Sequence, residues 1–220
     1  MIAYERLICL VIGYFFGCFQ TSYIFGRIFK KIDIREHGSG NAGANNTVRV
    51  MGTKFGITIF LFDVVKAMSA FILCSYIFNG TGTFASFGDA AAGVLPGIYA
   101  GLGVVLGHNF PVFLKFKGGK GIASSVGVIL CLDWRVAVIV FAVGLTAIII
   151  TRFVSLGAIL VTGLFPFVTF FFTNSIEIIA LCFIFGALAV FMHRGNIVRL
   201  VSGNERKFVL LTKGSINEKS

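Results

Sequence analysis

The chain has 220 residues, of which 57% are hydrophobic and 13% are charged, and 26 of them are phenylalanine. A soluble globular domain usually has about 25% charged residues, so this composition indicates an integral membrane protein and excludes a secreted disulfide scaffold, a coiled coil and a disordered chain. The net charge of +10 is expected to come mostly from Lys and Arg in cytoplasmic loops, with no nucleic acid as partner.

Seven apolar runs follow one another and predict seven transmembrane helices, because each span takes roughly 20 residues. They cover about 4–29, 55–78, 90–107, 121–132, 134–151, 153–173 and 176–192. The fourth run is short and is followed by Asp133-Trp134-Arg135, which we interpret as a tight interfacial turn with Trp134 at headgroup depth. The first run lacks a basic n-region and is too long for a signal peptide, so we expect it to be retained as a span.

The distribution of basic residues predicts the orientation. If the N-terminus is outside, the segments 27–54, 108–120, 151–154 and 193–220 are cytoplasmic, and they hold 6, 3, 1 and 6 of the 19 Lys and Arg residues. The positive-inside rule predicts this asymmetry. Without the short fourth span the basic C-terminal segment would lie outside, so seven spans are preferred. We therefore expect an all-α, polytopic protein with one membrane-embedded domain over 1–208 and a tail over 209–220.

Cysteine and glycine spacing adds two expectations. The five cysteines form no Cys-x-x-C pair and have no His at ligand spacing, so neither a metal site nor a disulfide framework is indicated. Glycines spaced by four allow helix backbones to approach closely. Such a stripe is formed by Gly93, Gly97 and Gly101, with Gly103 and Gly107 following. It predicts packing inside the monomer or a dimer face, and the oligomeric state is left open.

Three segments, 33–49, 107–121 and 193–207, are rich in Gly, small polar residues, Lys and Arg, and the topology places all three loops on the cytoplasmic face. Glycine permits positive φ and exposes backbone N–H groups, which can form an anion-binding nest. A helix that begins after such a loop adds its N-terminal dipole, and Arg49 and Lys120 lie near such helix starts. The pattern predicts one ligand with two phosphates or two phosphorylated ligands; the alternative is three solvated turns.

Several known motifs are absent. A P-loop would need a glycine where Leu114 stands and a Ser or Thr where Gly121 stands. The sequence has no G-x-S-x-G elbow, and no histidine is followed five residues later by an aspartate. The last of these absences argues against a His–Asp dyad that activates a hydroxyl.

Polar residues within the apolar runs are a further signal. Asp63 and Lys66 lie one turn apart in the second run and are expected to pair on one helix face. A structural pair, a proton path and a substrate contact all remain open. His193 and Asn196 are one turn apart at the end of the last run and are expected to face the interior of the helix bundle.

With these residues the sequence resembles the acyl-phosphate:glycerol-3-phosphate acyltransferases of bacterial phospholipid synthesis, the PlsY family. The motifs are Gly38-Ser39-Gly40-Asn41…Gly43-Ala44-x-Asn46…Arg49, then Gly107-His108-x-Phe110-Pro111-Val112-Phe113…Phe116-Lys117-Gly118-Gly119-Lys120-Gly121, and His193-Arg194-x-Asn196-Ile197-x-Arg199-Leu200…Gly203…Glu205. The resemblance extends from the first helix to Phe208. The departures are Asn45 for a usual Thr, Gly195 for a usual acidic residue and Arg206 for a usual Pro.

The resemblance implies a seven-helix enzyme of the bacterial cell membrane. It would transfer a fatty acyl group from acyl phosphate to the sn-1 hydroxyl of glycerol-3-phosphate, giving lysophosphatidic acid and inorganic phosphate. Acyl-CoA and acyl carrier protein would not be direct donors, and no cofactor or metal is expected. The partners would be acyl phosphate, glycerol-3-phosphate and membrane lipids.

The resemblance also implies roles for individual residues. The catalytic residues would be Ser39, Arg49, Lys120, His193 and Asn196. The substrate-binding residues would be Gly38, Gly40, Asn41, Gly43, Asn46, His108, Lys117, Gly118, Gly119, Ser155, Arg199 and Glu205. Ser39, the loop 38–43 and Ser155 would hold the acyl-phosphate head, and Arg49 and Lys120 would bind or screen phosphate. Asn196 and His193 would orient the glycerol hydroxyls and the carbonyl, and Glu205 would order the last loop.

Acyl phosphate is a mixed anhydride and is already activated, so positioning and charge stabilisation carry most of the catalysis. The leaving phosphate is the favoured proton acceptor, and His193 is the alternative base. Two other classes of function remain open: a transporter or channel for a small phosphorylated solute, and a membrane phosphatase or lipid-binding module.

Overall fold

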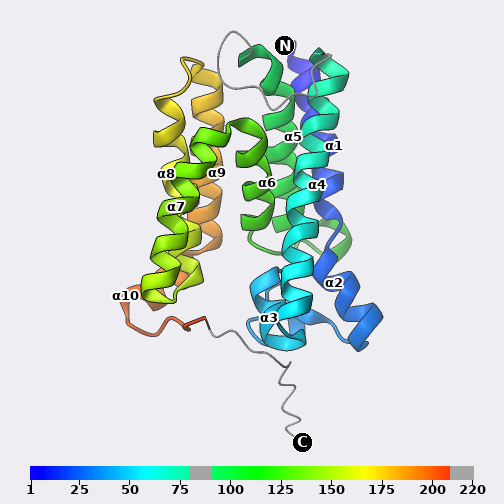
Figure 1. Ribbon diagram of the computed structural model, residues 1–220. Helices are drawn as coiled ribbons and strands as arrows, with labels where there is room; N and C mark the ends of the chain where they lie inside the picture. Colours follow the sequence, from blue (N-terminus) through cyan, green and yellow to red (C-terminus); the bar gives the residue numbers. More distant parts are fainter. Residues whose placement is uncertain (80–90, 209–220) are drawn as a thin grey trace, which may run out of the picture.

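The computed structural model describes residues 1–79 and 91–208, and each of the seven apolar runs contains one long helix (Figure 1). These helices are α1 (Ala3–Cys18), α4 (Thr53–Asn79), α5 (Ala91–Asn109), α6 (Ile122–Leu132), α7 (Trp134–Thr151), α8 (Val154–Phe170) and α9 (Ile176–Met192). The shorter helices α2 (Thr21–Phe25), α3 (Ala44–Met51) and α10 (Arg194–Val201) lie toward the end of the bundle away from the N-terminus. The all-α prediction is confirmed for the described residues. Residue 90 and the predicted tail 209–220 lie outside them.

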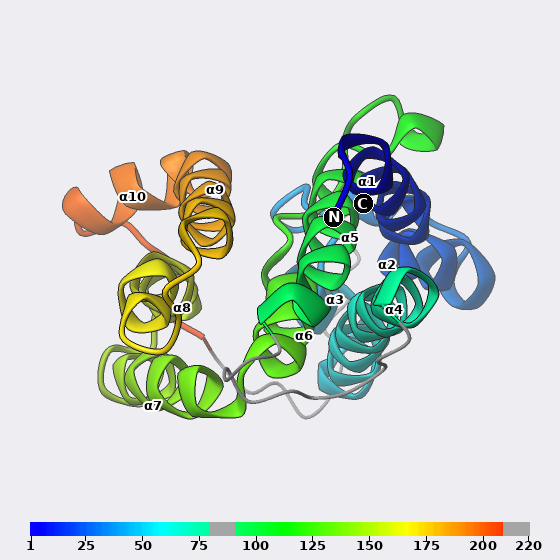
Figure 2. The ribbon, with the colours of Figure 1, turned by 90° about the horizontal axis from the view of Figure 1, so that it is seen from above.

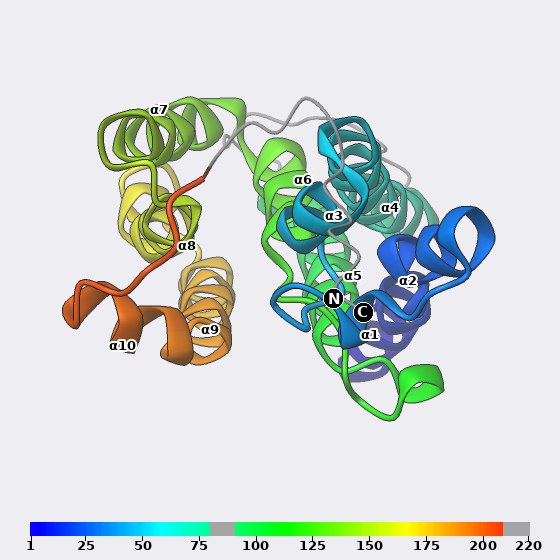
Figure 3. The ribbon, with the colours of Figure 1, turned by 90° about the horizontal axis from the view of Figure 1, so that it is seen from below.

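The long helices form two groups (Figures 2 and 3). One group contains α1, α4, α5 and α6, and the other contains α7, α8 and α9. Contacts of α5 with α9, and of α6 with α7 and α8, join the groups. A single apolar core runs through both, with Ile98 and Val128 fully buried in the first group and Phe165 and Phe185 in the second. A cavity between the two groups would therefore be lined by helices of both groups.

Length and hydropathy identify four segments of the described chain that can cross a membrane: Ala3–Lys30, Thr53–Asn79, Gly93–Leu114 and Trp134–Thr151. Helices α9 and α10, bent by 62° at the break between them, form a fifth candidate. The apolar helices α6 and α8 are shorter. The 11 residues of α6 measure about 16 Å at 1.5 Å per residue, roughly half of the hydrocarbon core. The protein is thus polytopic, and the count of seven spans stays a prediction.

The first run, predicted as one helix over 4–29, is broken at Phe19 and Gln20, where the backbone is not helical. The break has polar causes. The Phe19 carbonyl accepts a hydrogen bond from Lys66 Nζ at 2.9 Å, and the Gln20 amide donates to the His108 carbonyl at 3.0 Å. A carbonyl at a helix end needs such a partner when it is buried. Because these partners are distant in sequence, the hydrophobic pattern of the run does not reveal the break.

The interruption after α6 is a tight turn, as the sequence predicts. The Asp133 carboxylate accepts the backbone N–H of Arg135 at 2.7 Å and so caps α7. The Arg135 guanidinium donates back to the same carboxylate at 2.7 Å. A capping carboxylate satisfies an N–H group that has no partner within the helix, which is why α7 begins directly at Trp134.

The glycine stripe of α5 packs inside the monomer. Gly103 lies against the backbone of Leu10, Gly107 lies against the backbone of Tyr14, and a Cβ at either glycine would collide with α1. Gly101 meets α6 in the same way, at a valine side chain. Close approach of helix backbones at small residues is the usual basis of helix association in membranes.

Replacing Gly103 with alanine should therefore weaken the fold. The new methyl group would meet the Leu10 carbonyl, which belongs to a helix backbone and cannot rotate away. Overpacking of this kind costs about 1–3 kcal/mol, so the thermal unfolding midpoint in detergent should fall. Gly163→Ala is the matched control, because nothing lies within 4 Å of a Cβ at that position. Equal midpoints for the two variants would contradict the packing assignment.

Candidate functional site

A cavity of about 860 Å³ lies between the two helix groups, at the end of the bundle that carries α3 and α10. Most of the residues predicted for the site line it: Gly38, Ser39, Gly40, Asn41, Gly43, Asn46, Arg49, His108, Lys120, Ser155, His193, Asn196, Arg199 and Glu205. Lys117, Gly118 and Gly119 do not line it. All three predicted loops thus meet at one cavity.

The lining of the cavity is basic on one part and apolar on another. Its cations are Arg49, Lys120, Arg194, Arg199 and Arg206. Its carboxylates, Asp63 and Glu205, each pair with a cation. Its larger apolar side chains include Ile57, Phe60, Ile122, Ile148, Val154 and Met192. Uncompensated positive charge in a low-dielectric cleft attracts anions, so this cavity suits a ligand with anionic and aliphatic parts.

The first loop is held in shape by a buried amide. The Oδ1 atom of Asn46 accepts the backbone N–H of Ser39 at 2.7 Å, and its Nδ2 atom donates to the carbonyls of Ile34 and His37 at 3.0 Å each. Gly38 has a φ of 64°, in the left-handed region that glycine adopts without strain. Asn46 therefore shapes the loop from within and leaves the exposed Ser39 side chain at the cavity.

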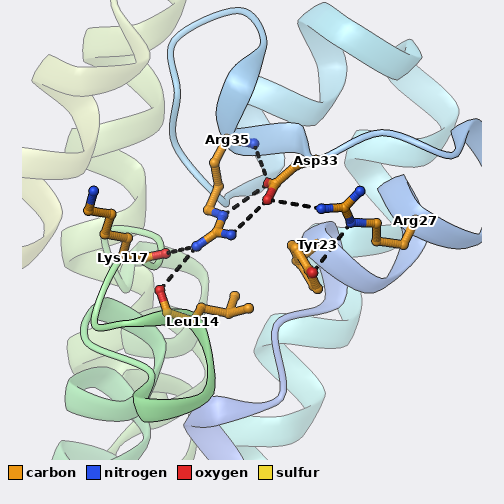
Figure 4. A network of polar contacts seen from close by, with 6 residues as sticks. All are labelled: Tyr23, Arg27, Asp33, Arg35, Leu114 and Lys117. Atoms are coloured by element: carbon orange, nitrogen blue, oxygen red, sulfur yellow. Dashed lines mark hydrogen bonds and ion pairs between the residues drawn. The ribbon is translucent and has the colours of Figure 1, made fainter.

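An arginine joins the first loop to the second (Figure 4). Asp33 accepts two hydrogen bonds from the Arg35 guanidinium, at 2.9 and 2.7 Å, and a longer one from Arg27 at 3.4 Å. The same Arg35 guanidinium donates to the carbonyls of Leu114 at 3.1 Å and Lys117 at 3.4 Å. The Lys117 side chain is exposed, and its backbone supplies this contact. The network fixes the two loops relative to each other.

The second loop wraps around the end of α5. The Gly119 N–H donates to the His108 carbonyl at 2.9 Å, and a Cβ at Gly119 would collide with the His108 imidazole. A Cβ at Gly118 would collide with the carbonyl oxygen of His108. The next residue, Lys120, reaches the cavity, where its ammonium group donates to Oδ1 of Asn196. Gly118 and Gly119 therefore position Lys120 at the cavity, but they do not line the cavity themselves.

The last loop is organised by Glu205. Its carboxylate accepts from the hydroxyl of Ser155 at 2.7 Å, from the amide of Asn196 at 2.7 Å and from the guanidinium of Arg199 at 2.8 Å. Burial alone would raise the pKa of Glu205, but these three hydrogen bonds outweigh burial and hold the pKa below its ordinary value. The ionised carboxylate thus ties α8 to α10. Because the only hydroxyl proton of Ser155 goes to Glu205, Ser155 must rotate before it can donate to a ligand.

The tautomer of His193 follows from its partner. Nδ1 of this buried ring lies 2.8 Å from the carbonyl of Ala189. A carbonyl only accepts hydrogen bonds, so the neutral ring carries its proton on Nδ1 and leaves Nε2 as an acceptor. His193 also lines the cavity next to Asn196. The ring is therefore in the state that a proton acceptor requires.

Lys120 gives the cavity a pH dependence. Burial, followed by the nearby cation Arg199, lowers the pKa of Lys120 from 10.5 to about 8. The ammonium form binds anions and is lost as the pH rises through this value, whereas a phosphate monoester stays dianionic above about pH 7. Binding of a phosphate monoester, measured by calorimetry, should thus weaken by up to about tenfold per pH unit above 8. Lys120→Arg, which stays charged, should bind without this decrease above pH 8. The same decrease in Lys120→Arg as in the wild type would contradict the assignment.

For some residues near the site, the sequence does not reveal their partners across the fold. Asp63 lines the cavity, and its partner Lys66 reaches His108 and the backbone at Phe19. Arg35 joins two loops that are about 80 residues apart. A basic residue in a Gly-rich loop and an ion pair in a span are both visible in the sequence, but the partners across the fold are not. In the described part of the chain, no group of three or more His, Cys, Asp or Glu side chains could hold a metal ion.

Comparisons with known proteins identify the family to which this chain belongs. The sequence matches the profile of the family described as Glycerol-3-phosphate acyltransferase over residues 7–203. It is 42% identical over 197 residues to the glycerol-3-phosphate acyltransferase of Thermoanaerobacter sp. (strain X514), covering 90% of this chain and 92% of that protein. It is 35% identical over 204 residues to the one from Clostridioides difficile (strain 630), covering 93% and 96%.

The fold is similar to that of a solved membrane protein. The crystal structure described as PlsY (YgiH), an integral membrane glycerol 3-phosphate acyltransferase, in its glycerol 3-phosphate form has a TM-score of 0.80 and 31% sequence identity, covering 93% of this chain and 96% of that chain. Its lysophosphatidic acid form has a TM-score of 0.78 at the same identity. The basic cavity, the family profile and the likeness to PlsY converge: this chain belongs to the glycerol-3-phosphate acyltransferase family, PlsY.

Proposed function

We propose that this protein transfers a fatty acyl group from acyl phosphate to the sn-1 hydroxyl of glycerol-3-phosphate, giving lysophosphatidic acid and inorganic phosphate. This is the first acylation step of phospholipid biosynthesis, and acyl-CoA and acyl carrier protein are not direct donors. Membership of the family supports the acylation of glycerol-3-phosphate. The two PlsY structures, described as the glycerol 3-phosphate form and the lysophosphatidic acid form, support the acceptor and the product.

The observation that carries the choice of donor is one cavity in which several cations lie near Lys120. Arg49, Arg194 and Arg199 lie close enough to affect the charge of Lys120. One phosphate would leave much of this charge uncompensated, whereas two phosphates balance it. The apolar part of the lining, with Ile57, Phe60 and Ile148, suits an acyl chain. Acyl phosphate and glycerol-3-phosphate together supply two phosphate groups and one aliphatic chain.

The reaction needs little covalent help from the protein. The sn-1 oxygen attacks the acyl carbonyl carbon, the bond from that carbon to the phosphate oxygen breaks, and the hydroxyl proton passes to the leaving phosphate. Ser39 and the loop 38–43 hold the acyl-phosphate head. Lys120 and Arg49 bind the phosphates and stabilise the negative charge that develops, and Asn196 orients the acceptor. His193, with Nε2 free to accept, is the alternative proton acceptor.

The orientation in the membrane follows from the same proposal. The cavity lies at the end of the bundle opposite the N-terminus. An N-terminus outside and a cytoplasmic cavity bring the site to the compartment where phosphorylated metabolites are made, and they agree with the excess of Lys and Arg in the loops at that end. The protein would act as one membrane-embedded unit over 1–208 in a bacterial cell membrane.

The test uses purified protein with palmitoyl phosphate and radiolabelled glycerol-3-phosphate, without CoA or acyl carrier protein. We expect labelled lysophosphatidic acid that depends on palmitoyl phosphate, and no product when palmitoyl-CoA replaces it. Product from palmitoyl-CoA alone would overturn the choice of donor. Phosphate release without an acceptor would indicate a phosphatase, and uptake of labelled glycerol-3-phosphate by proteoliposomes without acylation would indicate a transporter.

A further inference from the structure

A lysine lies deep within the fourth helix and is almost fully buried. Lys66 is 8% exposed and pairs with Asp63 at 2.6 Å. It stands 13 residues after Thr53, where α4 begins, or about 20 Å along the helix axis. A charged side chain at such a depth is costly and is by default a sign of function. If Lys66 served only to neutralise Asp63, this role would explain the ion pair. It would not explain the other contacts of Lys66.

All three protons of the Lys66 ammonium group have acceptors. Besides Asp63, they reach the carbonyl of Phe19 at 2.9 Å and Nδ1 of His108 at 3.0 Å. An ammonium group only donates hydrogen bonds, so Nδ1 of His108 must accept. The neutral His108 ring therefore carries its proton on Nε2. Lys66 fixes both the tautomer and the orientation of the His108 ring.

The other side of the His108 ring supports the second loop. Gly119 lies directly against Nε2, so closely that a Cβ would collide with the ring. The Gly119 N–H is also tied to the His108 carbonyl at 2.9 Å. A rotation of the ring would displace the Gly119 backbone, and the next residue is Lys120. The contacts thus run from Lys66 through His108 to the cation that enters the cavity.

We propose that Lys66 is a positioning residue that acts through His108 to set the position of the 118–120 loop, and thereby of Lys120 in the cavity. On this account His108, although it lines the cavity, supports the loop and does not bind substrate. The inference rests on the proposed function only in its kinetic consequence, because the contacts themselves need no substrate.

The main test variant is Asp63→Asn/Lys66→Met, which removes the lysine without leaving an unpaired carboxylate in the membrane. The second is His108→Asn, whose amide oxygen can replace Nδ1 as the acceptor for Lys66 but leaves Gly119 without support. The matched control is Arg6→Met/Glu177→Gln, which neutralises a two-hydrogen-bond ion pair, at 2.7 and 2.8 Å, near the other end of the bundle. Thermal unfolding reports the folded fraction of each variant.

The first readout is the pH dependence of labelling of Lys120 by a small amine-reactive reagent, followed by mass spectrometry. In the wild type, half-maximal labelling is expected at about pH 8. In both test variants, the pH of half-maximal labelling should shift toward the ordinary lysine value, because a displaced loop exposes Lys120. In the control variant it should stay at about pH 8. The charged groups that face Lys120 are the same in all variants: Arg49, Arg194, Arg199 and Glu205.

The second readout is kcat/KM per folded protein in the acyl phosphate assay. Misplacing a catalytic group by about 1 Å can cost roughly 100-fold in rate, and we expect a decrease of up to that size in both test variants and none in the control. If Lys120 labelling stays at the wild-type pH, or if activity follows the folded fraction alone, the inference is wrong. If the wild type itself has no turnover, the proposed function fails, and the labelling experiment still decides the role of Lys66.

Discussion

Lys120→Met should lower kcat/KM by about 10²–10³-fold, because removing one group that stabilises developing charge costs roughly 2.7–4 kcal/mol in a water-excluded site. The half-buried ammonium group of Lys120 enters the cavity, and its bond to Asn196 connects it to Glu205. Its loss removes a cation from the place where two phosphates would meet. It also leaves the Asn196 amide oxygen without its donor.

The controls for this prediction separate charge from geometry. Lys54→Met removes an exposed lysine of α4 that does not line the cavity, and it should leave kcat/KM unchanged. Lys120→Arg keeps the charge but replaces a compact ammonium group by a planar guanidinium, so its activity should lie between those of Lys120→Met and the wild type. Steady-state rates with palmitoyl phosphate as donor measure all three. A loss of less than threefold in Lys120→Met would remove Lys120 from the reaction.

Gly119→Ala should be almost as damaging, although Gly119 does not line the cavity. A methyl group there would collide with the His108 imidazole, which Lys66 holds in place. The loop must then move, and Lys120 moves with it. Displacing a catalytic group by about 1 Å costs roughly 100-fold in rate, and we expect a loss of that size in kcat/KM. The folded fraction should fall less than the activity.

Gly163→Ala again serves as the matched control, since its Cβ would lie in open space. The decisive comparison is Gly119→Ala combined with His108→Ala, which makes room for the new methyl group. If the collision causes the loss, the double variant should be no worse than His108→Ala alone. Independent, additive losses would mean that the two residues act separately, because sites that share a contact are not additive.

The helices could be predicted from the hydrophobic runs with little error. Helix α7 has the bounds predicted for its run, 134–151, because Asp133 provides a local cap that is visible in the sequence. The break at Phe19 could not be predicted in the same way. It depends on Lys66 and His108, and both are far away along the chain. Local signals therefore give the helices, and buried polar contacts decide where a helix is interrupted.

The location of the site could be predicted from the sequence, but the roles of its individual residues could not. Charge asymmetry placed the three loops on one face, and in the structure they line one cavity. The individual roles depend on tertiary contacts. Asn46, expected to bind substrate, has its amide engaged by the backbone of its own loop, and Gly119 lies behind the lining against His108. A glycine motif indicates a close backbone approach, but it does not say whether a ligand or a side chain is approached.

In the proposed reaction, both substrates occupy one cavity together and react directly. The measurement that tests it is the initial rate at varied palmitoyl phosphate and glycerol-3-phosphate concentrations, with phosphate release followed in the absence of acceptor. Direct transfer predicts double-reciprocal lines that intersect, and no phosphate burst without glycerol-3-phosphate. Parallel lines with a stoichiometric burst of phosphate that is lost in Ser39→Ala would instead mean that a serine of the first loop carries the acyl group, and would contradict the account.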